Sequence, residues 1–140
     1  MNHRRILHRQ ALVVLLVAGL AATPAAAAPL RFRATEAPAG GAVLEVQAEE
    51  LVTMTALPFR LLLKDAAGQP LAGGKVACDL SMPSMAMPEN RPKISARDGA
   101  YVGVMILTCT MGDWRMTCTA EGDRGGRRTL TFDLGRARLP

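Results

Sequence analysis

In the stretch FRLLLKDAAGQP, residues 59–70, every second residue at the start is a large apolar one, and the stretch ends in Gly and Pro. Phe59, Leu61 and Leu63 fall on one side of an extended chain, while Arg60 falls on the other. Because successive side chains of a strand point to opposite faces, this pattern predicts a β-strand with one buried face. The Gly and Pro at the end of the stretch predict a turn or hairpin.

The same alternation recurs along the chain, separated each time by Gly, Pro or Asp turns. Segment 93–97 is short and polar, which suits an edge strand, and segment 101–110 is expected to pair with 114–121 as a hairpin. Further strands are expected over residues 44–47, 51–57, 75–80 and 129–134. No segment has a convincing helical period. We therefore predict an all-β fold, an immunoglobulin-like antiparallel β-sandwich of seven to eight strands, with a barrel as the alternative.

Length and composition allow one small globular domain. The 140 residues are 49% hydrophobic and 21% charged, which argues against both a disordered chain and a multi-pass membrane protein. Three of the 17 basic residues, Arg4, Arg5 and Arg9, lie in the first ten positions, and the remaining 14 face 12 acidic residues. Nucleic-acid binding needs much stronger clustering of positive charge, so nucleic acid is not an expected partner.

The amino end has the three parts of a secretory signal peptide over residues 1–28. A basic stretch is followed by an apolar run and then by small residues that permit cleavage after Ala27. We therefore expect a periplasmic protein that is not inserted in the membrane after cleavage. The alternative is an uncleaved segment that anchors the chain to the inner membrane, because the apolar residues 11–28 just reach spanning length. Residues 29–41 are expected to be a flexible segment, and residues 42–140 the domain.

Both histidines, His3 and His8, lie in the predicted signal peptide. The exported domain therefore lacks the commonest general base, the partner of Ser and Cys nucleophiles, and the usual ligand of zinc and copper(II). We see no pair of carboxylates that would replace them. No catalytic residue is proposed, and the sequence favours a protein that is not an enzyme.

Three cysteines are expected to point into the core. Alternation places Cys78, Cys109 and Cys118 on inward positions, and an odd number allows at most one internal disulfide with one thiol left over. The expected hairpin register pairs Cys109 with Met116, which disfavours a bond between Cys109 and Cys118. We expect a bridge between the two sheets from Cys78 to Cys118 or Cys109. The alternatives are three small core residues or a thiolate metal site.

Methionines form the most unusual motif. Met82, Met85 and Met87 lie within the run MPSMAMP, residues 82–88, and Met111 is expected at the tip of the later hairpin. A thioether prefers copper(I) or silver(I) and is not lost to protonation, so these four residues are candidate ligands in a domain without histidine.

Geometry sets two conditions on this site. An extended chain from Met82 to Met87 spans about 17 Å, so the loop must bend near Ser84, or only Met85 and Met87 can act together. Met111 contributes only if its turn lies at the same end of the sandwich as the loop. The alternative is that Met82 caps the core and that the other methionines form an apolar partner surface.

Several motifs together resemble a known family. The turn at residues 65–71, the run MPSMAMP, the segment DGAY at 98–101 and the segment MGDW at 111–114 resemble YtkA-like domains and the related FixH-like proteins of bacterial envelopes. The resemblance covers residues 58–121. It implies an immunoglobulin-like sandwich outside the cytoplasmic membrane, copper handling without catalysis, and an envelope metal-handling protein as partner. The resemblance also implies that the metal ligands are Met82, Met85, Met87 and Met111, and that Trp114 belongs to the core.

This chain departs from the FixH-like pattern by its cleavable amino end and by its three cysteines. Two functions remain. The first is an exported domain that binds copper(I) through the methionine cluster. The alternative is a metal-free interaction module that docks on an envelope or respiratory-complex partner.

Overall fold

The computed structural model describes residues 27–36, 41–65, 67–71, 73–122 and 126–140. These residues form eight β-strands and no helix. The strands are β1 (Leu30–Arg33), β2 (Ala42–Val46), β3 (Leu57–Leu63), β4 (Lys75–Ser81), β5 (Ile94–Arg97), β6 (Ala100–Met105), β7 (Asp113–Glu121) and β8 (Arg127–Arg136). The predicted signal peptide lies almost entirely outside the described residues.

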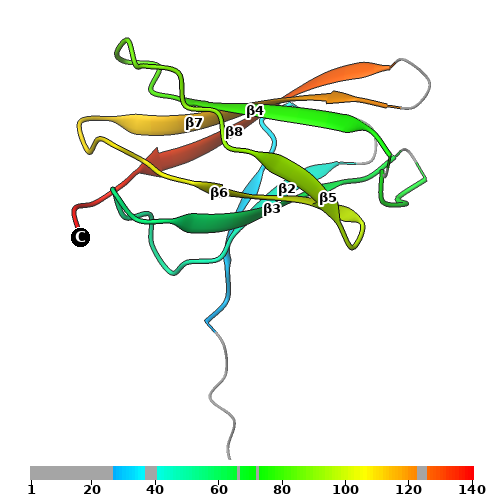
Figure 1. The fold of residues 1–140 in the computed structure, drawn as a ribbon, viewed down its shortest axis with the longest axis horizontal. Helices are drawn as coiled ribbons and strands as arrows, with labels where there is room; N and C mark the ends of the chain where they lie inside the picture. The colour runs from blue at the N-terminus through cyan, green and yellow to red at the C-terminus, as the bar shows by residue number, and fades with distance from the viewer. Residues whose placement is uncertain (1–26, 37–40, 66, 72, 123–125) are drawn as a thin grey trace, which may run out of the picture.

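The strands form two antiparallel sheets that pack face to face (Figure 1). One sheet has five strands in the order β1-β2-β3-β6-β5, and the other has three in the order β4-β7-β8. Leaving out β1, these orders correspond to the ABED and CFG sheets of an immunoglobulin constant domain. The predicted immunoglobulin-like β-sandwich is confirmed, as is the edge position of segment 93–97, which contains β5.

The core follows from alternation on both sheets. On β3 the inward residues Phe59, Leu61 and Leu63 are buried, as the sequence pattern predicted. On β7 the inward residues include Trp114 and Met116, which are also buried. Because each sheet buries only one face, the two apolar faces can be removed from water only by packing on each other.

Three expectations about the chain path are wrong. Residues 51–57 were expected to form a strand, but only Leu57, the first residue of β3, belongs to one. Residues 29–41 were expected to be a flexible segment, but Leu30–Arg33 form β1 and pair with β2. Segments 101–110 and 114–121 do not form a hairpin, because β6 ends at Met105 and lies in the five-stranded sheet, whereas β7 lies in the other. Alternation reveals which face of a strand is buried, but it does not reveal which strand is its neighbour.

Three loops gather at one end of the sandwich, at the left of Figure 1. They are the β2–β3, β4–β5 and β6–β7 connections, and the carboxyl terminus lies at the same end. We call this the methionine end, because Met54, Met85 and Met111 lie in these three loops and are all exposed. The β5–β6 connection, the end of β7 and the start of β8 lie at the opposite end.

Candidate functional site

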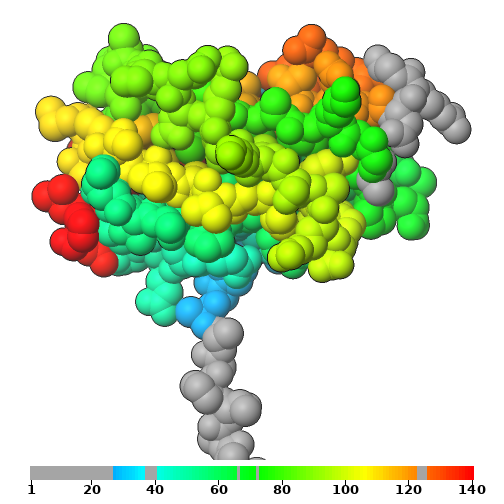
Figure 2. All heavy atoms as spheres, viewed as in Figure 1, coloured from blue at the N-terminus to red at the C-terminus, as the bar shows by residue number. Residues whose placement is uncertain are grey.

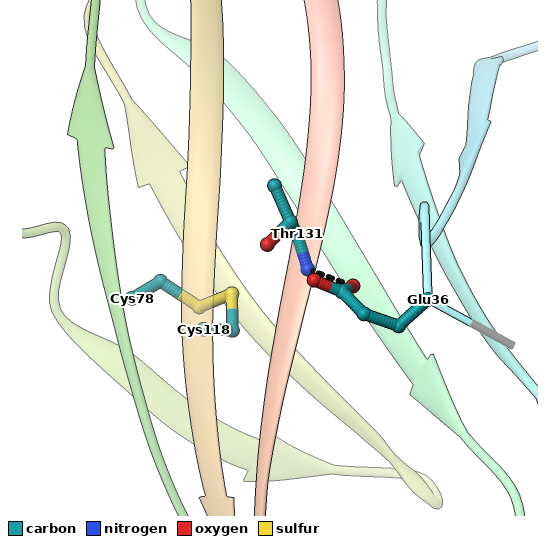
Figure 3. The surroundings of a disulfide bond; sticks show 4 residues. All are labelled: Glu36, Cys78, Cys118 and Thr131. Atoms are coloured by element: carbon teal, nitrogen blue, oxygen red, sulfur yellow. Dashed lines mark hydrogen bonds between the residues drawn. A yellow bond between two sulfur atoms is a disulfide. The ribbon is translucent and has the colours of Figure 1, made fainter. Parts of the chain in front are cut away.

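A disulfide holds together the two strands that lead to the methionine end. Cys78 on β4 and Cys118 on β7 are bonded and face each other directly across the two strands, with their Cα atoms 4.0 Å apart (Figure 3). The expected pairing of Cys78 with Cys118 is confirmed, but the bridge lies within the three-stranded sheet, so its expected position between the two sheets is wrong. The expectation failed because it treated β7 as the hairpin partner of β6, whereas β7 pairs with β4.

The same strand pair brings two methionine segments to one place. Ser81, the last residue of β4, pairs with Arg115 near the start of β7, so the loop after β4 and the turn before β7 begin side by side. The approach continues beyond the strands. A Cβ atom added at Gly112 would lie 2.7 Å from Ser84 Oγ and 3.1 Å from Met82 Cε. The MPSMAMP loop and the turn that carries Met111 are thus in direct contact, which meets the second condition for a shared site.

The methionine loop also bends where the first condition requires. The Met85 backbone N–H donates to the Met82 carbonyl oxygen at 3.1 Å, which closes a turn through Pro83 and Ser84. The side chain of Met82 is only 1% exposed and belongs to the core. Its thioether therefore packs between the sheets and is not open to an ion from solvent, in agreement with the alternative in which Met82 caps the core.

Two of the four candidate ligands are open to solvent. Met85 is 40% exposed and Met111 is 73% exposed, and they lie on the two segments that touch at Gly112. Met87 is half-buried and packs against the core from its edge. Figure 2 shows the green and yellow segments that contain these residues side by side at the left of the molecule. Fewer of the four candidate ligands are thus exposed to solvent than the sequence suggested.

Cys109 adds a third soft donor to this place. Its Sγ accepts a hydrogen bond from the Met111 backbone N–H at 3.4 Å, so the thiol and Met111 belong to one tight turn. The indole N–H of the buried Trp114 donates to the Cys109 carbonyl oxygen at 2.8 Å and thereby attaches this turn to the core. Cys109 is half-exposed and carries no disulfide, so its expected inward position is only partly correct. The sequence Cys-Thr-Met at residues 109–111, with two sulfur side chains close together, could have indicated that Cys109 lies near Met111.

Met54 was not among the predicted site residues, although it shares the methionine end. It is 70% exposed and has a φ of 56°, in the left-handed region that residues other than glycine rarely adopt. Its backbone N–H donates to the Leu107 carbonyl oxygen at 2.8 Å, two residues before Cys109. The strained backbone thus holds a third exposed thioether at this end, but no described contact joins it to the MPSMAMP loop.

A shallow hollow lies beside the touching segments. Its lining includes Pro83, Ser84 and two acidic residues, Asp113 and Asp133. The Asp133 carboxylate accepts from Arg115 Nε at 2.8 Å. The hollow therefore contains two carboxylates, and one of them is paired with the Arg115 guanidinium that also lines it.

Among the described residues, no group of three His, Cys, Asp or Glu side chains could hold a metal ion. None of the described segments forms an apolar helix of membrane-spanning length. A scan of family models finds no match to this chain, and neither do searches of curated proteins and solved structures. The arrangement of the sulfur atoms is thus the main guide to function.

Proposed function

We propose that this protein is an exported, non-enzymatic domain that binds copper(I) at its methionine end. The observation that carries the proposal is the contact of Gly112 with Ser84 and Met82, which brings the exposed thioethers of Met85 and Met111 onto adjoining segments. Met82 supports the turn from the core, and the half-buried Met87 is available as a further donor.

The donor set explains the choice of metal. Thioethers are soft, uncharged ligands that favour copper(I), whereas copper(II) favours imidazole and oxygen donors. Cys109 can add one thiolate, which would offset the positive charge of the ion. A cysteine thiol must lose its proton before it can bind the ion as a thiolate, whereas a thioether has no such proton. The two kinds of donor therefore differ in how they respond to pH.

Two features support an oxidising location outside the cytoplasm. The chain contains a disulfide, and such bonds persist in the periplasm and in secreted proteins. Residues 1–28 have the pattern of a signal peptide. The partner we propose is an envelope metal-handling protein that exchanges the ion at the exposed end. An uncleaved amino segment would keep the domain on the periplasmic side of the inner membrane.

A copper(I) titration tests the proposal. The protein is titrated with copper(I) in ascorbate, with bicinchoninate as the competing chelator, and the native chain is compared with the double variant Met85→Leu and Met111→Leu. We expect the native chain to take up one ion and the double variant to lose stoichiometric uptake, because leucine keeps the volume but removes the sulfur. Met54→Leu is the matched control, since Met54 is almost as exposed as Met111.

Unchanged affinity in the double variant would reject the proposed ligands. Cys109→Ser then separates the thiolate from the thioethers. With Cys109 as a ligand, the affinity of the native chain falls as the pH falls, because protons compete for the thiolate. The serine variant should bind more weakly at neutral pH and with less dependence on pH. Equal pH profiles would remove Cys109 from the site.

A metal-free interaction module is the second candidate. The methionine end also exposes Ile106 and Leu139, so it presents apolar surface of the kind that partners cover. Leucine substitutions at Met85 and Met111 keep this surface, but aspartate substitutions do not. Under this alternative, the leucine variant would still recover a partner by crosslinking, the aspartate variant would not, and the native chain would take up no copper(I).

A further inference from the structure

The outward face of the five-stranded sheet carries an excess of positive charge. Among the outward positions of its strands, Glu45 is the single acidic residue described. We call this surface the basic face, and its cations are Arg31 and Arg33 on β1, Arg60 on β3, Arg97 on β5 and Lys93 just before β5.

Strand register places these residues on one side. Arg31 is opposite Glu45, Glu45 is opposite Arg60, and Arg60 is opposite Val102 in the next strand. Directly opposite residues in an antiparallel pair share a face. The Arg31 guanidinium lies 3.0 Å from the Glu45 carboxylate, whose side chain is largely covered. Glu45, the single acidic residue among the described outward strand positions, is therefore already paired.

An apolar strip runs between the cations. Val102, Val104 and Ile106 line a shallow groove together with Pro58, and Arg60, Lys93 and Arg97 line the same groove. Val104 and Ile106 are each nearly half exposed. The groove therefore combines small apolar side chains with a cationic rim.

On the outward face of the three-stranded sheet, the positive charges are instead matched by acidic residues. Its register sets Lys75 and Arg127 opposite Glu121, and Arg115 opposite Asp133. Arg136 is opposite Asp113, so all these bases face acids. The charge excess is thus specific to one side of the sandwich, and a general basic character of the protein does not explain it.

We propose that the basic face docks on the surface of an anionic phospholipid bilayer. Clustered Lys and Arg side chains are attracted to acidic headgroups, and small apolar residues between them can pack against the interface. The broad face of an antiparallel sheet suits an extended charged surface. The blue amino end of the described chain also lies on the side of the five-stranded sheet (Figure 1). This proposal does not depend on the copper site.

Amine footprinting tests the docking in the full chain. Lys93 lies on the basic face and Lys75 on the outward side of the three-stranded sheet, so one protein contains both the probe and its control. The chain is mixed with phosphatidylcholine vesicles, with or without phosphatidylglycerol, and treated with a membrane-impermeant acylating reagent. Mass spectrometry then follows each lysine. We expect phosphatidylglycerol to slow the acylation of Lys93 severalfold and to leave that of Lys75 unchanged.

Charge variants identify the surface. Each cation near an anionic membrane strengthens binding by about fivefold. Arg60→Gln with Arg97→Gln should therefore raise the lipid concentration for half-maximal protection by about 25-fold. Arg115→Gln with Arg127→Gln removes the same charge from the other side and should change it little. In about 1 M NaCl, where the Debye length is about 3 Å, the protection should disappear.

Three outcomes would overturn the proposal. Equal protection of Lys93 by neutral and anionic vesicles would show that headgroup charge is not recognised. Protection of Lys93 by soluble poly-L-glutamate but not by vesicles would assign the face to an acidic protein. Protection that increases with protein concentration in the absence of lipid would assign it to a second copy of this chain.

Discussion

The two sheets of this sandwich both bury an apolar inner face, but they differ in covalent bonding and in the charge of their outer faces. The three-stranded sheet is joined by the Cys78–Cys118 bridge, and its register sets outward bases opposite acidic residues. The five-stranded sheet has no described disulfide, and its outward face carries nearly unopposed cations. The strands β4 and β7 also lead directly to the exposed methionines, whereas the broad basic face lies on the other layer.

Under the two proposals, the two layers would have different tasks. Soft-metal coordination needs sulfur atoms held in a fixed relation, and a covalent bond between β4 and β7 keeps the strand ends beside each other. Docking on an extended charged surface needs breadth more than local precision, and five paired strands provide it. Each prediction below removes one feature of one layer, or of the link between them.

The largest effect is expected from removal of the disulfide. The bonded cysteines are 40 residues apart, and closing a loop of that size in the unfolded chain stabilises the protein by about 4 kcal/mol. Cys78→Ala with Cys118→Ala should lower the free energy of unfolding by about this amount in urea titrations. It should also weaken copper(I) uptake, because the strand ends are no longer tied.

Cys109→Ala is the matched control for the loss of stability, since Cys109 is half-exposed and forms no described disulfide. Its stability should change by less than about 1 kcal/mol, as for a single partly buried side chain. An equal loss in both variants would show that the bridge has no special share in the stability of the three-stranded sheet.

A smaller effect is expected from a packing change in the five-stranded sheet. A Cβ atom at Gly103 would lie 2.7 Å from both the Lys93 carbonyl oxygen and Phe59 Cζ. Gly103→Ala should therefore destabilise the fold by about 1–3 kcal/mol through overpacking. A lower urea midpoint with an unchanged slope would show this effect.

Copper(I) affinity should remain unchanged in Gly103→Ala, because Gly103 lies in the other sheet from β4 and β7. Parallel losses of stability and copper affinity would contradict the separation of tasks. Val104→Ala, one residue along and pointing outward, is the control for β6 and should cost much less.

The smallest effect concerns the link between the layers. The Glu36 carboxylate accepts a hydrogen bond from the Thr131 backbone N–H on β8 at 2.8 Å (Figure 3). The Thr35 backbone N–H also donates to the Thr131 carbonyl oxygen. A hydrogen bond with the Thr131 side chain, helped by the backbone N–H groups of Glu36 and Thr131, holds the pKa of Glu36 below its usual value of 4.5. The ionised carboxylate therefore stabilises the folded state.

Glu36→Gln should lower the free energy of unfolding slightly at neutral pH. Because folding lowers the pKa, the native advantage is complete above the usual value of 4.5 and is lost as the pH falls through the lower folded value. Urea titrations over this pH range should show the two proteins converging on the acid side. A constant difference at every pH would show that the charge of Glu36 is not involved.

Much of the candidate site could be expected from sequence because it depends on side-chain chemistry. Met85 and Met111 were candidates since thioethers are soft donors and the chain lacks histidine beyond its amino end. The burial of Met82 and the participation of the Cys109 turn were not evident. Both depend on how the loop folds back on Gly112, and a linear pattern does not encode that contact.

Alternation along the chain was sufficient to establish an all-β sandwich and the inward residues of most strands, because the period of two is a local property of an extended backbone. The partners of β6 and β7, the placement of the disulfide within one sheet, and the basic face on the other depended on packing between distant segments. Those pairings are set by which apolar faces fit together in three dimensions, so residues far apart in the chain determined them jointly.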